Sequence, residues 1–413
     1  MKKYILIILC CLTSFPLWSY NVNMIVEHYS VDQGLPNNTV NCTLKDRDGF
    51  IWFGTWYGLC CFDGVKFKTF NKQEHDSDVP PRKIQRIVED KNGYIWVKTI
   101  DRKLYVFNKV TECFHAVYDD MKNYSENIQV IKLQNTAEGD VLLLTKDKNL
   151  LLAGVDEKGQ VTIKILFDSR DEINKHDYTL KHHVLCETEE YISWIGTDYK
   201  VSAVHKGAEL ASRPADFITS KINSGDKDSF TSFFEDGRKV WVGDRAGIFY
   251  SIDVRTGLVN RYVLSEIKGA ISNLLVTPAG YVYLSVAGQG TYEYDLAERR
   301  LQKINTEMND AMVTHAFIDQ YDKIWFHENE KALIYYDPLN HTAKRFPFTM
   351  FGKITTLYSE DAGERGLFFL SPAGEAWLFD REHAEMVYIN KLKQLSNDRA
   401  NQQFYHLMLD NDG

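Results

Sequence analysis

Hydrophobic and polar residues alternate in short runs along most of the chain, and sequences typical of tight turns separate these runs. In the clearest segment, residues 39–64, alternating or apolar runs occupy 40–44, 50–55 and 59–62, with an Asp-Arg-Asp-Gly sequence at 46–49 and a short connection at 56–57. Alternation with a period of two predicts β-strands, and Asp-Gly sequences favour tight hairpin turns. The segment therefore predicts three consecutive antiparallel strands.

The same arrangement recurs at 83–99, 229–253, 270–286 and 315–337, with weaker copies around Leu142, Trp194 and Phe368. One large residue marks the second strand of each copy, and successive markers lie 44, 46, 52, 47, 42, 42 and 43 residues apart. The markers are Trp52, Trp96, Leu142, Trp194, Trp241, Tyr283, Trp325 and Phe368. A period of roughly 40–50 residues built from short antiparallel strands is typical of propeller blades.

We therefore predict an all-β fold, a β-propeller whose blades have four antiparallel strands, seven-bladed and followed by the start of a second propeller. The markers are expected in the core, because each blade hides its apolar faces only against its neighbours. A β-sandwich is the alternative, but sandwiches do not repeat a turn followed by a tryptophan.

The predicted domains are a signal peptide at 1–20, a first propeller of seven repeats at 21–350 and an incomplete second propeller at 351–413. A ninth copy begins at 402 and the sequence stops inside its turn. Because an unpaired strand edge is unfavourable, we expect a longer parent protein.

Lys2 and Lys3 precede an apolar run at 4–12, which is typical of a secretory signal peptide and predicts a periplasmic location. The run is shorter than a bilayer span. Large residues near the expected cleavage point leave an uncleaved N-terminal anchor as the alternative.

Composition excludes some classes of protein. The formal net charge is −9 and no dense Lys/Arg run occurs, so nucleic acid is not an expected partner. Five of the 7 cysteines lie beyond the signal, two of them adjacent, which does not indicate a disulfide framework. We expect them to be small buried apolar residues: Cys42, Cys60, Cys61, Cys113 and Cys186.

Residues 29–64 closely resemble the two-component regulator propeller repeat. The resemblance rests on Gly34-Leu35-Pro36 followed by two asparagines, on the Asp-x-Asp-Gly turn leading into 51–55, and on Gly58-Leu59 before Phe62-Asp63. It implies the periplasmic sensor region of a hybrid two-component system. Its relatives carry two seven-bladed propellers, a β-sandwich domain, one membrane span, a histidine kinase, a receiver and a DNA-binding module.

The sequence given contains neither the span nor the kinase, so we expect the chain itself not to be an enzyme and its full-length parent to be an inner-membrane histidine kinase. The implied partners are downstream sensor domains and a second copy in a homodimer, with the membrane reached only through the missing C-terminal region.

In a blade, turns between strands one and two lie on one face of the propeller, and connections between strands two and three lie on the other. The second set mixes aromatic, charged and amide groups, which suits a hydroxyl-rich ligand such as an oligosaccharide. The candidate ligand-binding residues are Trp56, Tyr57, Arg102, Tyr199, Asp244, Arg245 and His327.

We predict no catalytic residues, cofactor or metal. The Asp46-x-Asp48-Gly49 turn resembles the start of a calcium loop, but Tyr57 stands where the closing Glu would fall. Alternatives to a sensor are a secreted propeller enzyme, either a polysaccharide lyase or a glycosidase, and a non-catalytic interaction scaffold.

Overall fold

The structure is a computed structural model. It describes residues 29–70, 80–122, 124, 129–146, 149–167, 185–188, 190–195, 200–207, 217–221, 230–304, 313–328, 331–351, 357–361 and 363–391. Over these residues the fold is almost entirely β, with eight antiparallel sheets of four strands each. The predicted all-β propeller architecture is confirmed. The signal-peptide prediction and the ninth copy lie outside the described residues.

The strands of the first four sheets, here called blades 1 to 4, follow chain order. They are β1 (Val40–Lys45), β2 (Ile51–Thr55), β3 (Leu59–Phe62), β4 (Phe67–Phe70); β5 (Ile84–Glu89), β6 (Ile95–Thr99), β7 (Leu104–Asn108), β8 (Cys113–Ala116); β9 (Val130–Asn135), β10 (Val141–Thr145), β11 (Leu150–Val155), β12 (Val161–Phe167); β13 (Leu185–Glu187), β14 (Tyr191–Ile195), β15 (Lys200–His205) and β16 (Phe217–Lys221).

Blades 5 to 8 continue in the same way. They are β17 (Phe230–Glu235), β18 (Lys239–Asp244), β19 (Ile248–Asp253), β20 (Val259–Val263); β21 (Ile271–Val276), β22 (Tyr281–Val286), β23 (Gly290–Asp295), β24 (Arg300–Lys303); β25 (Val313–Ile318), β26 (Ile324–Glu328), β27 (Ala332–Asp337), β28 (Thr342–Pro347); β29 (Tyr358–Asp361), β30 (Leu367–Leu370), β31 (Glu375–Asp380) and β32 (Glu385–Lys391). The described helices are short: η1 (Val31–Gln33), α2 (Tyr118–Met121), η3 (Phe348–Phe351) and η4 (Gly363–Arg365).

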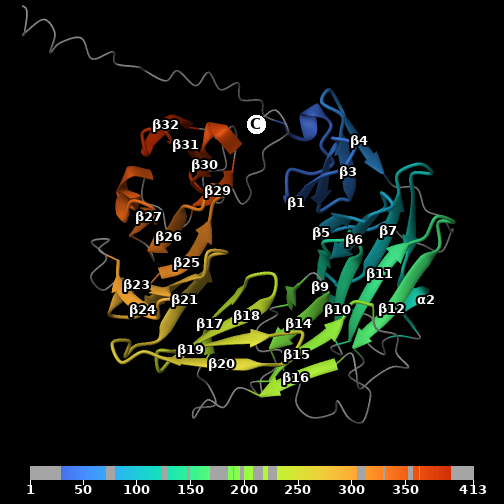
Figure 1. Ribbon diagram of the computed structural model, residues 1–413. Coiled ribbons are helices and arrows are strands. Elements are labelled where there is room, and N and C mark those ends of the chain that lie inside the picture. Colours follow the sequence, from blue (N-terminus) through green and yellow to red (C-terminus); the bar gives the residue numbers. More distant parts are fainter. Residues whose placement is uncertain are drawn as a thin grey trace, which may run out of the picture.

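The blades follow one another around an arc, with the first strand of each blade nearest the centre and the last strand at the outside (Figure 1). Within each sheet the strands pair in chain order, so each first strand has one edge that pairs with no strand of its own sheet. Those edges face the middle of the ring (Figure 1).

Most of the marker residues fill the spaces between blades, as predicted. Trp52 is 3% exposed and packs in one cluster with Ile84, Ile95 and Phe107 of the next blade. The other markers whose burial is described are buried as well, except Phe368: Trp96, Leu142, Trp241, Tyr283 and Trp325. The side chain of Trp194 lies outside the described part of the chain.

A single aspartate in the first turn of a blade explains the recurring Asp-plus-Trp pattern. Asp46 accepts hydrogen bonds from the backbone N–H groups of Asp48 and Phe50 and, through its other oxygen, from the indole N–H of Trp52 at 2.8 Å. Gly49 closes this turn with φ 91°, a conformation that L-residues rarely adopt. The same indole–carboxylate bond recurs in three other blades, at Trp96–Asp90, Trp241–Asp236 and Trp325–Asp319.

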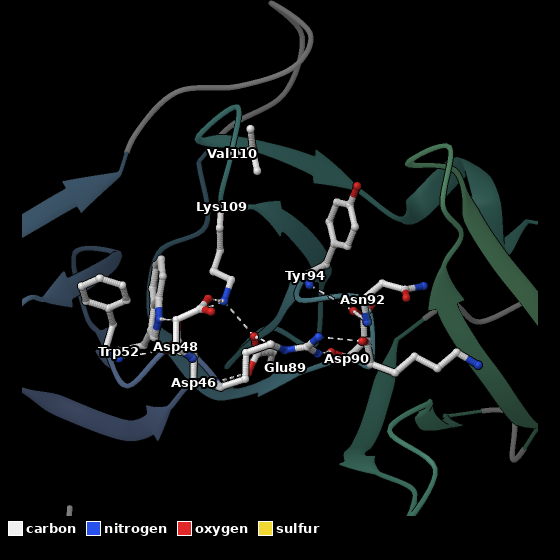
Figure 2. Close-up of polar contacts among 12 residues, drawn as sticks. Asp46, Asp48, Trp52, Glu89, Asp90, Asn92, Tyr94, Lys109 and Val110 are labelled. Carbon is white, nitrogen blue, oxygen red and sulfur yellow. Dashed lines mark hydrogen bonds and ion pairs between the residues drawn. The ribbon is translucent and has the colours of Figure 1, made fainter. Parts of the chain in front are cut away.

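A cation from the third turn of one blade reaches back to the preceding blade at three junctions. Lys109 of blade 2 lies with Nζ 3.0 Å from Asp46, 2.7 Å from Asp48 and 2.7 Å from Glu89 (Figure 2). We call this arrangement the cation clamp. It recurs where Lys206 contacts Glu138 and Glu187, and where Arg381 contacts Asp319 and Asp361.

The clamp also accounts for the calcium-like turn. Oxygen atoms of Asp46, Asp48 and Glu89 lie within 4.8 Å of one another, close enough to share a cation. The ammonium group of Lys109 lies among them (Figure 2). The positive charge that balances these three carboxylates is therefore supplied by Lys109 of blade 2.

Blade 8 packs on blade 7 as the earlier blades pack on one another. Trp325 lies 5.4 Å from Phe369 and 4.6 Å from Phe379, measured between ring centroids. Phe368 points to the other side of the sheet and is only partly buried. Seven sheets thus lie inside the predicted first propeller, and the eighth continues the same arc (Figure 1). The assignment of 351–413 to a second propeller stays a prediction.

Cys42, Cys60 and Cys61 are buried, as expected, and Cys113 is partly exposed; all four are free thiols. No described helix has the length and apolar character needed to cross a bilayer.

Candidate functional site

The second turns of blades 1 and 2 lie on one face, because each is hydrogen-bonded to the start of the following blade. The N–H of Lys83 donates to the carbonyl of Trp56 at 2.9 Å, and the N–H of Ile100 donates to the carbonyl of Lys83. The N–H of Val130 in turn donates to the carbonyl of Arg102 at 3.0 Å. Trp56 and Arg102 therefore lie on the same face of neighbouring blades, as their positions in the repeat predicted.

Four of the predicted ligand residues present their side chains to solvent. Trp56 is 39% exposed, Tyr57 is 65% exposed, and Arg102 and Arg245 are also exposed. The ammonium of Lys83 lies 5.0 Å from the ring centre of Trp56, within the range of a cation–π contact. These groups are available to a ligand on this face.

Asp244 has a different place from the one expected. Its carboxylate accepts hydrogen bonds from the N–H groups of Ala246 and Ile248 and caps the turn after β18, and the residue is 2% exposed. Thr55, Thr99 and Thr145 cap the corresponding turns of blades 1 to 3. Burial raises the pKa of Asp244. Its side chain therefore supports the turn rather than facing the rim.

His327 was expected in the connection after β26 but lies within that strand, because the strand continues to Glu328. It is partly buried, with its ring 5.0 Å from that of Phe348. Burial, together with the neighbouring His315, lowers its pKa. Tyr199 lies outside the described residues.

A polar cleft opens along the inner edge of blades 1 to 3, and the predicted residues do not include it. It has a volume of about 440 Å³ and is lined by consecutive residues of β1 and β5 together with Asn135. Its polar side chains are amides, a hydroxyl and charged groups: Asn41, Thr43, Lys45, Gln85, Arg86, Glu89 and Asn135. Such a set can donate to and accept from the hydroxyls of a sugar.

Lys98 extends this polar surface into the junction between blades 2 and 3. Its Nζ donates to Gln85 Oε1 at 2.9 Å and to the carbonyl of Ile131 at 2.6 Å. The residue is 7% exposed. Burial lowers the pKa of Lys98, and the positive charges of Arg102 and Arg86 lower it further.

The position of Lys98 is occupied by glycine and tightly closed in blades 1 and 5. Gly54 and Gly243 stand there, and a Cβ added to Gly54 would lie 2.6 Å from Cγ2 of Ile84. The next blade fills the space directly in those two junctions. Blade 2 instead places a long cationic side chain at this point, facing carbonyl and amide oxygens.

Sequence reasoning missed the cleft and Lys98 because it considered only turn residues as ligand contacts. One signal was present in the sequence: the copy at 83–99 has Lys98 where the copies at 39–64 and 229–253 have glycine. A break of the repeat at a buried position is where a functional demand is expected.

A protein-family model described as "Two component regulator propeller" matches residues 34–57. This segment is a two-component regulator propeller repeat, as its motifs predicted. No curated protein matches the chain significantly.

Solved structures similar to the chain include the Dos1 propeller, with a TM-score of 0.50, 14% identity and coverage of 81% of this chain and 90% of that one. Virginiamycin B lyase from Staphylococcus aureus has a TM-score of 0.41 and 11% identity, covering 68% of this chain and 89% of the lyase. An extracellular domain from B. thetaiotaomicron, assigned to the hybrid two component system BT4673, has a TM-score of 0.39 and 14% identity and is matched by 89% of this chain.

The chain spans 62% of the length of that extracellular domain. At identities this low, structural similarity bears on the fold alone, and the similarity to the Dos1 propeller agrees with the propeller seen here.

Proposed function

We propose that this chain is the ligand-sensing region of a two-component regulator, and that its ligand is an oligosaccharide bound in the central cleft and on the adjoining face of blades 1 to 3. The observation that carries the proposal is the cleft itself, which is lined in part by the regulator repeat at 34–57 and presents amide, hydroxyl and cationic groups. Exposed Trp56 and Tyr57 on the same face offer rings for stacking against sugar C–H surfaces.

The parent protein in this proposal is an inner-membrane histidine kinase with its sensor in the periplasm. Ligand binding would change how this region packs against downstream sensor domains and against a second copy of the chain. A ligand acts on such an equilibrium only through a difference in affinity for the two arrangements. The proposal therefore requires a ligand that contacts more than one blade, as the cleft between β1 and β5 provides.

A glycosidase is the second candidate function, because such an enzyme would bind its substrate in the same cleft. Retaining and inverting glycosidases both need a pair of carboxyl groups across the scissile bond. Among the described residues that line the cleft, Glu89 is the only carboxylate, and Lys109 and Arg47 already contact it. The lining therefore supports binding rather than hydrolysis.

The test is a thermal-shift screen of the purified chain against a panel of oligosaccharides, followed by chromatography of the mixtures. We expect at least one oligosaccharide to raise the melting temperature and to be recovered unchanged, because a ligand that binds only the folded state stabilises it. Shortened or unsaturated products would favour the enzyme. A panel in which no saccharide shifts the melting temperature would refute the oligosaccharide ligand.

A further inference from the structure

Blade 2 departs from the repeat at one buried position, and the departure leaves positive charge without a carboxylate to balance it. Lys98 is the most buried Lys or Arg side chain among the described residues, and both of its hydrogen-bond acceptors are neutral oxygens. Burying an ammonium group in this way is unfavourable unless an anion accompanies it.

The cation clamps show that the protein pairs several other half-buried cations with carboxylates. Lys109, Lys206 and Arg381 each contact two or more carboxylates at 3.0 Å or less. Lys323 likewise lies 2.7 Å from Asp337. Lys98 instead donates only to neutral oxygens among the described residues, although it is more deeply buried than these four cations.

The charges around Lys98 add to the imbalance. Arg86 lies across the strand pair from it, and Arg102 follows on the turn after β6. Both are exposed, and neither forms an ion pair with a described residue. The nearest carboxylate on that turn, Asp101, is engaged by the hydroxyl of Thr99 and by Lys103. A chain with net charge −9 thus holds Arg102 and Arg86 close enough to Lys98 for their charges to act on it.

We infer that Lys98, Arg86 and Arg102 form a binding site for an oxyanion, a carboxylate or sulfate group, carried by the ligand in the neighbouring cleft. That the anion belongs to a saccharide rests on the function proposed above. Guanidinium groups bind such anions through paired N–H donors, and the Lys98 ammonium supplies a further positive charge. Gln85 connects the two regions, because it lines the cleft and accepts from Lys98.

The experiment compares four probes on the same protein: inorganic sulfate, a neutral oligosaccharide, and the uronic-acid and sulfated forms of that oligosaccharide. Binding is measured by thermal shift and calorimetry at constant ionic strength. We expect sulfate alone to raise the melting temperature, and at least one acidic oligosaccharide to bind more tightly than its neutral counterpart.

Two variants locate the effect. Lys98→Met keeps the length of the side chain and removes its charge, and Arg86→Gln removes an exposed guanidinium. Each should weaken the binding of the acidic ligand by roughly ten-fold to a hundred-fold, the effect of losing one charge-assisted hydrogen bond. Lys303→Gln removes an exposed positive charge on β24, far along the chain from blade 2, and should leave binding unchanged. Circular dichroism checks that each variant is folded.

The outcomes separate the two proposals. If sulfate stabilises the protein, the variants abolish this effect and no saccharide binds, the anion site holds and the oligosaccharide ligand fails. If saccharides bind but the neutral and acidic forms bind equally, the sensor proposal holds and the anion site is refuted. An equal loss of anion binding in Lys303→Gln would also refute it, because the effect would then come from overall charge.

Discussion

The cation clamp between blades 1 and 2 should contribute measurably to stability, and Lys109→Met tests this. The substitution keeps most of the apolar stem of the side chain and removes the ammonium that three carboxylates share. Any loss of stability then reports the charge rather than packing. The clamp joins the first turn of one blade to the third turn of the next, so it acts on the junction between them (Figure 2).

The expected magnitude follows from burial and from the partners that remain. The Asp46 side chain is fully buried, and Glu89 and Lys109 are 10% and 19% exposed. Removing one member of a buried ion pair costs about 3–5 kcal/mol. Asp46 keeps its hydrogen bonds from Trp52 and the turn amides, and Glu89 keeps its contact with Arg47. We therefore expect the free energy of unfolding to fall by about 2–3 kcal/mol.

Equilibrium urea unfolding followed by tryptophan fluorescence measures this change, and Trp52 at the same junction provides one of the signals. The matched control is Lys68→Met, which breaks a second ion pair between the same two blades. Lys68 and its partner Glu112 are 55% and 41% exposed. Exposed pairs contribute less than about 1 kcal/mol. Equal destabilisation by the two variants would refute the argument from burial, as would a Lys109→Met protein as stable as the wild type.

Three further predictions concern Trp52, Asp46 and Trp56. Trp52→Phe keeps an aromatic ring but removes the donor to the buried Asp46 carboxylate. In the same urea assay the free energy of unfolding should fall by about 1–3 kcal/mol. An unchanged free energy of unfolding would show that the hydrogen bond is dispensable. Burial opposes ionisation of the Asp46 carboxyl, but hydrogen bonds from Trp52 and Lys109 outweigh this effect and lower its pKa. The ionised carboxylate therefore stabilises the folded state above the usual pKa near 4, and this contribution is lost as the pH falls through the lower pKa of the folded state. The stability difference between wild type and Lys109→Met should therefore shrink in unfolding curves recorded below about pH 4, and a difference that grows on acidification would contradict this sign. Trp56→Ala should weaken oligosaccharide binding in calorimetry while changing stability by less than about 0.5 kcal/mol, because the ring is exposed; a large loss of stability would instead make it a packing residue.

Much of the fold could be predicted from the sequence because the repeat carries its own turn chemistry. Asp46, Gly49 and Trp52 are close in sequence and satisfy one another locally, so their pattern reports the hairpin directly. The seventh blade shows the tolerance of this pattern. Asp322 replaces the turn glycine there and adopts φ 58°, which aspartate accepts more readily than most residues.

The candidate site was less predictable. The exposed positions of Trp56, Tyr57, Arg102 and Arg245 follow from turn length alone. The buried position of Asp244 could not be predicted in this way. A polar residue at the end of a strand either caps its own turn or faces solvent, and which of the two occurs depends on where the strand ends.

The sequence by itself determined the repeating hairpin, its period, and the large residue that must be buried between neighbours. The hairpin and its period depend on contacts within a few residues, which local sequence can specify, and the repetition of one large residue indicates that neighbouring blades bury it. Only the tertiary structure decided that Lys98 faces Gln85 and Ile131, that Lys109 reaches the turn of the preceding blade, and that β1 and β5 leave a cleft between them. Each of these contacts joins different strands or blades, and the angle at which successive sheets pack sets which side chains meet there.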